Sequence, residues 1–209
     1  MMIEKLKPKI ENYFNCTSHD FFHTQRVYNL ATIIAKKEKA DLEIVQAAAL
    51  LHDIGRHLEE KDPTLCHAEE SAKMAPAILK SINFPENNID KVMHCIKVHR
   101  YSKGLKAETK EAEILQDADR LDALGAICIA RVFSKGGEKK RPLYNQDIKP
   151  SEKYDTNSKT TSINHFYEKI LKLKPETFKT KTAKKIAEER YRYTADFIDR
   201  FKKEWNGEI

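Results

Sequence analysis

The hydrophobic residues of the chain recur at helical spacing almost from end to end, and no strand-like alternation of useful length interrupts them. Apolar positions three and four residues apart predict helices over residues 2–14, 19–39, 41–53, 67–82, 89–99, 111–133, 162–173 and 180–205. We therefore predict an all-α fold, a compact helical bundle that ends in further helices.

Polar segments separate the predicted helices. Residues 56–66 and the lysine-rich residues 101–110 are predicted to be loops. A glycine pair is predicted to end the helix over 111–133, and residues 134–161 are predicted to be irregular. In a compact domain, a connection that long is often a lid or a binding loop.

The apolar helix that begins near Asp41 ends in two adjacent residues that can bind a metal, a histidine and an aspartate. Its buried face leads directly into His52 and Asp53, and Gly55 follows. Burying a carboxylate beside an imidazole is costly unless something compensates, and a metal ion is the usual compensation. Because neighbouring residues on a helix diverge by about 100°, other helices must supply the remaining ligands.

The preceding helix offers a histidine for this purpose. His19 and His23 are four residues apart and share one helix face. His19 follows a candidate cap at Ser18, so we expect it to support the helix start. His23 is flanked by the buried face, so we expect it to bind a metal.

A second source of ligands is an acidic cluster inside an apolar helix, formed by Asp117, Asp119 and Asp122. Aspartates are poor residues for a helix interior and are rarely buried unpaired. Asp119 and Asp122 share a face, whereas Asp117 points elsewhere. The alternative is that the cluster only pairs with Arg120 and surface lysines.

The composition indicates a soluble globular protein rather than a membrane or secreted one. The 209 residues are 40% hydrophobic and 33% charged, which is typical of a soluble globular chain. No apolar run approaches the ~20 residues that span a bilayer, and the N-terminus lacks signal-peptide features, so we expect a cytoplasmic protein without a membrane partner. The net charge of +6 comes largely from spaced helix-face lysines. Such charge alone is a weak signal for nucleic acid, and an anionic small substrate would suit it equally well, so we do not expect a nucleic-acid partner.

The order His23, His52-Asp53, Asp119 resembles the signature of the HD-domain metal-dependent phosphohydrolase superfamily. Four segments also resemble a small bacterial subfamily that includes nucleotide pyrophosphohydrolases: residues 19–27, 116–123, 130–133 and 162–169. The resemblance implies a single HD domain over residues 1–209, with a metal-binding core at about 19–125 and a C-terminal helical extension at about 126–209.

The resemblance implies that His23, His52, Asp53 and Asp119 bind one divalent ion, with Asp53 also counted as catalytic. Mixed nitrogen and oxygen ligands suit Mn, Fe, Co, Ni, Zn or Mg and do not select among them. Such an ion activates water and polarises a phosphoryl group.

His67 and His99 are further catalytic candidates, because the stretch after His52-Asp53 resembles HD proteins that hold two ions through additional histidines. Either could instead donate a proton to the leaving group, and His67 could simply cap its helix. His94 is five residues from His99, so the two cannot face one ion together.

Phosphate needs nearby cations. Arg26, one turn beyond His23, is the best placed, and the weaker candidates are Arg56, Lys103 and Arg131. Arg56 and Arg131 could equally balance an aspartate. Asp122 is a candidate acceptor that orients a metal-bound histidine.

The predicted activity is metal-dependent hydrolysis of a nucleoside triphosphate to the monophosphate and pyrophosphate. The alternatives are a 5′-nucleotidase, a two-ion phosphodiesterase acting on cyclic nucleotides or RNA, and a nucleotide sensor without turnover. Sensors usually lose a ligand, and here all four positions are filled. The long final helix could pack on the domain or form a homodimer contact.

Overall fold

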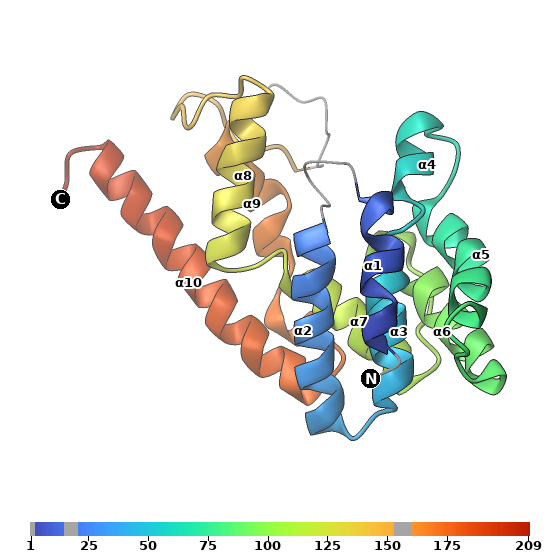
Figure 1. Cartoon of the computed structure of the whole chain (residues 1–209). Coiled ribbons are helices and arrows are strands. Elements are labelled where there is room, and N and C mark those ends of the chain that lie inside the picture. Colours follow the sequence, from blue (N-terminus) through green and yellow to red (C-terminus); the bar gives the residue numbers. More distant parts are fainter. Residues whose placement is uncertain (1–2, 15–20, 153–159) are drawn as a thin grey trace. The chain divides into compact units, whose positions relative to one another are not determined.

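The computed structural model describes residues 3–14, 21–152 and 160–209 of the chain. These residues form helices and no strand, which confirms the all-α prediction. The α-helices are α1 Lys7–Ile10, α2 Phe21–Glu38, α3 Leu42–Leu51, α4 Arg56–Lys61, α5 His67–Lys80, α6 Glu86–Val98, α7 Lys110–Leu121, α8 Ala126–Glu138, α9 Ser162–Glu168 and α10 Lys181–Trp205 (Figure 1). Short 3₁₀ segments occupy Ile3–Lys5, Glu11–Tyr13, Tyr101–Lys103, Ile170–Lys172 and Pro175–Thr177.

The chain divides into two compact units. Unit 1 contains the residues up to Arg120 together with Lys179–Ala183, and unit 2 contains Leu121–Phe178 and Lys184–Ile209. The prediction of one HD domain with a C-terminal extension stays a prediction. None of the described helices is both long and apolar enough to cross a bilayer.

Helix α3 is the centre of unit 1. It packs against α2, α5 and α6, and every residue from Ile44 to Leu51 is buried. Apart from Gln46, all of these residues are apolar, as expected for a helix that is surrounded by others. The Asp41 carboxylate caps its first turn by accepting hydrogen bonds from the backbone N–H groups of Glu43 and Ile44 at 3.1 and 3.2 Å. Because His52 and Asp53 directly follow this helix, they lie buried in the core of unit 1.

Residues 56–61 form a helix, whereas all of residues 56–66 were predicted to be a loop. Helix α4 is short and polar, so it lacks the apolar period that reveals a helix in sequence. Its N-cap is Gly55, where a Cβ atom would lie 2.7 Å from the Ser71 backbone nitrogen of α5. The Gly55 N–H donates to Ser71 Oγ at 2.8 Å. Glycine thus allows α4 and α5 to approach closely.

Two other predicted boundaries were wrong. The helix expected over 111–133 is interrupted at Gly125, which has a φ of 84° that favours glycine. The Gly125 N–H donates to Thr194 Oγ1 at 2.9 Å. The glycine pair at 136–137 lies inside α8 rather than ending a helix. Gly136 is there because it packs against Ser162.

The N-terminal stretch also differs from its prediction, because the helix expected over 2–14 is three short pieces. The helix expected over 162–173 ends at Glu168 and continues as a 3₁₀ turn. The predictions made for Ser18 and His19 lie outside the described residues.

Candidate metal centre

Three helices of unit 1 bring the four predicted metal ligands together. His23 comes from α2, His52 and Asp53 from the turn after α3, and Asp119 from α7. His23 Nε2 lies 3.4 Å from Asp119 Oδ1 and 3.9 Å from Asp53 Oδ2. His52 Nε2 lies 3.7 Å from the same Asp53 oxygen. Ligands about 2.1 Å from one ion are separated by roughly 3 to 4 Å, so these atoms can share an ion.

The state of His52 suits a metal ligand. Its Nδ1–H donates to the Ala49 carbonyl at 2.8 Å, so a neutral ring carries its lone pair on Nε2. That nitrogen is buried and has no hydrogen-bond partner in the described part of the chain. Burial lowers the pKa of His52 to about 4, so the ring is neutral near pH 7. A buried lone pair without a donor is a position that a divalent ion would satisfy.

The other Asp53 oxygen faces a second pair of histidines. Asp53 Oδ1 lies 3.4 Å from His67 Nε2 and 3.6 Å from His99 Nε2. The His99 Nδ1–H donates to the Ile96 carbonyl at 2.7 Å, which again leaves Nε2 as an acceptor in the neutral ring. Two groups of described residues could hold an ion, His23–His52–Asp119 and His52–Asp53–His99, and His67 belongs to neither.

Arg56 binds Asp53 through both carboxylate oxygens. Its Nε donates to Oδ2 at 3.0 Å and its Nη2 to Oδ1 at 3.2 Å. Nη2 also lies 3.1 Å from His67 Nε2. Burial works to raise the pKa of the Asp53 carboxyl, but the neighbouring His52 ring and the Arg56 guanidinium hold it well below its usual value. Asp53 is therefore ionised.

Two residues of this network were missed from the sequence. The Glu59 carboxylate accepts a hydrogen bond from His67 Nδ1, and its Oε1 accepts one from Arg100 at 2.8 Å. Burial works to raise the pKa of Glu59, but these hydrogen bonds lower it to about 2. Arg56 and Glu59 are three apart on α4 and share a face. That spacing would have signalled Glu59 had residues 56–66 been recognised as partly helical.

The remaining predicted residues lie in different surroundings. Arg26 is half-buried on α2, one turn beyond His23, and Lys103 is exposed. His94 Nε2 accepts from the Glu108 N–H at 3.3 Å. Asp117 accepts hydrogen bonds from the backbone N–H groups of residues 179 and 180 at 2.8 to 3.1 Å, and so points away from the cluster.

Arg131 and Asp122, both in unit 2, bind each other at 2.7 Å between Nη1 and Oδ2. This ion pair agrees with the alternative prediction that Arg131 balances an aspartate. Their roles at a phosphate and at a metal-bound histidine stay predictions.

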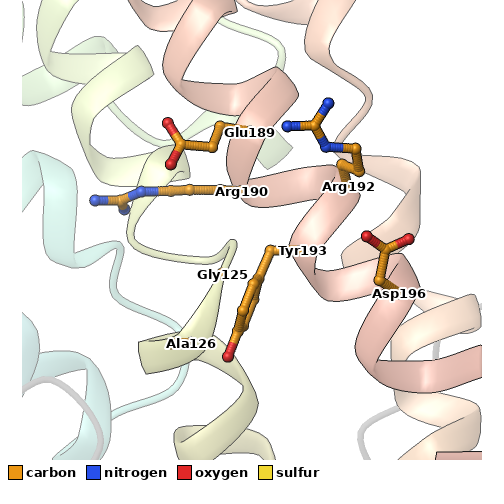
Figure 2. A pocket seen from close by; sticks show the side chains of 7 residues that line it. All are labelled: Gly125, Ala126, Glu189, Arg190, Arg192, Tyr193 and Asp196. Atoms are coloured by element: carbon orange, nitrogen blue, oxygen red, sulfur yellow. The ribbon is translucent and has the colours of Figure 1, made fainter. Parts of the chain in front are cut away.

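Unit 2 contains a separate hollow of about 440 Å³. Figure 2 shows the Tyr193 ring extending from α10 past the first residues of α8, with acidic and basic side chains above it. The lining residues are Gly125, Ala126, Glu189, Arg190, Arg192, Tyr193 and Asp196. None of them is a histidine or a cysteine, so the hollow offers carboxylates but no softer metal ligand.

The model of the HD domain family matches residues 20–124, about half of the chain. The chain belongs to the HD domain family. The matched range of the HD domain contains all four candidate metal ligands as well as Arg56, Glu59, His67 and His99.

Relatives of this HD domain extend over nearly the whole chain. The uncharacterised protein YpgQ of Bacillus subtilis (strain 168) is 34% identical over 195 residues, which cover 91% of this chain and 86% of YpgQ. A crystal structure of an HD-superfamily hydrolase from Bacillus thuringiensis is 36% identical, with a TM-score of 0.78 and coverage of 98% and 96% of the two chains. The structure of YpgQ in complex with ADP is 31% identical, with a TM-score of 0.73 and coverage of 97% and 94%.

Proposed function

We propose that this HD domain is a divalent-metal-dependent phosphohydrolase acting on nucleotides. The observation that carries the proposal is the convergence of His23, His52, Asp53 and Asp119, whose ligand atoms lie 3.4 to 3.9 Å apart. The two aspartates supply two negative charges to a divalent ion, and the histidines supply neutral nitrogen ligands. Mn, Fe, Co, Ni, Zn or Mg would suit this set.

We infer a nucleotide substrate because a relative that matches the chain over 97% of its length was crystallised with ADP. The specific reaction that we propose is hydrolysis of a nucleoside triphosphate to the monophosphate and pyrophosphate. The net charge of +6 would favour the approach of such an anion.

A bound divalent ion would polarise the phosphoryl group and lower the pKa of a water molecule. The chain supplies the other parts. Arg26 lies one turn from His23 and is a candidate cation for a phosphate oxygen. His99 presents an Nε2 lone pair, so in its neutral form it accepts a proton rather than donating one. The predicted role of His99 as a proton donor would therefore require it first to be protonated on Nε2.

A two-ion phosphodiesterase is the second candidate. It is favoured by the grouping of His52, Asp53 and His99, whose ligand atoms lie within 4.8 Å of one another. A sensor without turnover is disfavoured, because all four ligands of the first ion are present.

The test of the substrate is a panel of compounds. Protein stripped of metal and reloaded with each ion is offered nucleoside mono-, di- and triphosphates and cyclic nucleotides, and phosphate and pyrophosphate are measured separately. We expect pyrophosphate from triphosphates. Phosphate from monophosphates would establish a nucleotidase, and opening of a cyclic nucleotide would establish the phosphodiesterase.

A further inference from the structure

The two oxygens of Asp53 face opposite sets of ligands. Oδ2 lies towards His23 and His52, at 3.9 and 3.7 Å, whereas Oδ1 lies towards His67 and His99, at 3.4 and 3.6 Å. A carboxylate in this arrangement could bridge two ions, the first on the Oδ2 side and the second on the Oδ1 side.

The Oδ1 side already contains a positive charge. Arg56 Nη2 lies 3.2 Å from Asp53 Oδ1 and 3.1 Å from His67 Nε2. Asp53 Oδ1 is an atom that a second ion on this side would need, and His67 Nε2 is the histidine nitrogen closest to that oxygen, at 3.4 Å. A guanidinium group only donates hydrogen bonds, so His67 Nε2 must be the acceptor in this contact.

Glu59 fixes His67 in the form that this contact requires. Its carboxylate accepts from His67 Nδ1, so the ring proton is on Nδ1 and the lone pair is on Nε2. Arg100 in turn holds the other Glu59 oxygen at 2.8 Å. Glu59 is thus already bonded to two partners, and the described residues around His67 offer a second ion little negative charge beyond Asp53.

The charges also disfavour a second ion. Asp53 and Asp119 together balance one divalent ion, and Arg56 adds a further positive charge beside them. A second divalent ion would be adjacent to the guanidinium and would be repelled.

We propose, on the basis of the ion site assigned above, that Arg56 takes the place of a second metal ion. The centre then holds one divalent ion per chain on the Oδ2 side of Asp53, and Glu59 is a positioning residue that keeps His67 as the acceptor for Arg56. This assignment favours the one-ion hydrolase over the two-ion phosphodiesterase.

The test is metal stoichiometry in the full chain. Wild type, Arg56→Ala and Arg56→Lys are stripped, saturated with Mn²⁺ and freed of excess, and bound manganese is measured by elemental analysis. Electron paramagnetic resonance then distinguishes an isolated Mn²⁺ ion from a coupled pair. Lys61→Ala is the matched control, because it removes one positive charge from an exposed position on the same helix.

We expect one ion in wild type, Arg56→Lys and Lys61→Ala, and two coupled ions in Arg56→Ala. Two ions in wild type would overturn the proposal even if Arg56→Ala failed to fold, and so would a single ion in a folded Arg56→Ala. Failure of the proposed function gives a different result, since wild type would then bind no ion or bind one without turnover.

Discussion

Asp117 and Asp119 are two residues apart on one helix and have different surroundings. Asp117 is fully buried and accepts hydrogen bonds from the Lys179 and Thr180 backbone N–H groups and from Thr180 Oγ1. Asp119 keeps 29% of its side chain exposed and faces His23. Asp117 thus binds α7 to residues 179 and 180, whereas Asp119 faces the candidate ion site.

We expect Asp117→Ala to lower the free energy of unfolding by about 2–4 kcal/mol, because it leaves buried N–H groups without an acceptor. Mn²⁺ binding should persist in the folded fraction. Asp119→Ala should instead leave the free energy of unfolding of metal-free protein nearly unchanged and abolish Mn²⁺ binding. Urea unfolding and titration calorimetry measure both quantities. Loss of ion binding in a well-folded Asp117→Ala protein would contradict these assignments.

At the scale of elements, the contact between α4 and α5 fixes the geometry of Arg56 and His67. Gly55 lies at the start of α4, and a Cβ atom there would come within 2.9 Å of the His67 carbonyl oxygen and within 2.7 Å of the Ser71 nitrogen. Both are backbone atoms, which cannot rotate away as a side chain could. The two helices would have to separate.

We therefore expect Gly55→Ala to destabilise the protein by about 1–3 kcal/mol and to displace Arg56 from His67. Gly137→Ala is the control, since its Cβ would meet nothing within 4 Å in helix α8, and alanine there should stabilise by about 0.5–1 kcal/mol. Thermal unfolding of both variants provides the measurement. An equal response of the two would show that the close approach at Gly55 has no energetic effect.

The sequence predicted the elements whose apolar period is strong. Helices α2, α3 and α10 begin and end close to their predicted residues among those described. Helix α4 was missed because it is short and its residues are mostly polar, and Arg56 and Glu59 face the candidate site. The break between α7 and α8 was missed because Leu121 and Leu124 continue the apolar spacing across it.

The same reasoning explains which site residues could be predicted. His52 and Asp53 are notable in sequence because they follow an unbroken apolar run, Ala47–Leu51. Glu59 and Arg100 gave no such signal, because they are 41 residues apart and meet only in the folded chain. The carboxylate that fixes His67 could have been found from the sequence only if α4 had been recognised as a helix that places Glu59 on the face of Arg56.

At the scale of the whole molecule, stability should depend on pH through buried histidines. Burial, with Lys169 and Arg141 nearby, lowers the pKa of His165 from 6.5 to about 4. The unfolded chain therefore binds a proton at a higher pH than the folded chain does. His165 consequently contributes stability above pH 6.5 that is lost as the pH falls towards 4.

We expect the urea midpoint of metal-free protein to fall between pH 7 and pH ~4.5, and His165→Gln to reduce that fall. His52 and His67 titrate in the same direction, since burial lowers the pKa of each to about 4, so the variant should keep part of the dependence. If the urea midpoint fell equally between these two pH values in wild type and in His165→Gln, His165 would not be among the groups responsible.

All of the candidate ion ligands belong to unit 1, whereas residues 134–152 and α9 belong to unit 2. The central claim therefore concerns unit 1 alone, namely that His23, His52, Asp53 and Asp119 hold a divalent ion used to hydrolyse a nucleotide.

The most direct measurement is pyrophosphate release from a nucleoside triphosphate by stripped protein before and after reloading with metal. Asp53→Ala is compared with Asp90→Ala, which removes an exposed aspartate on α6. We expect no release without metal, release on reloading in wild type and Asp90→Ala, and none in Asp53→Ala. Metal-independent release, or equal release by a folded Asp53→Ala protein, would contradict the central claim.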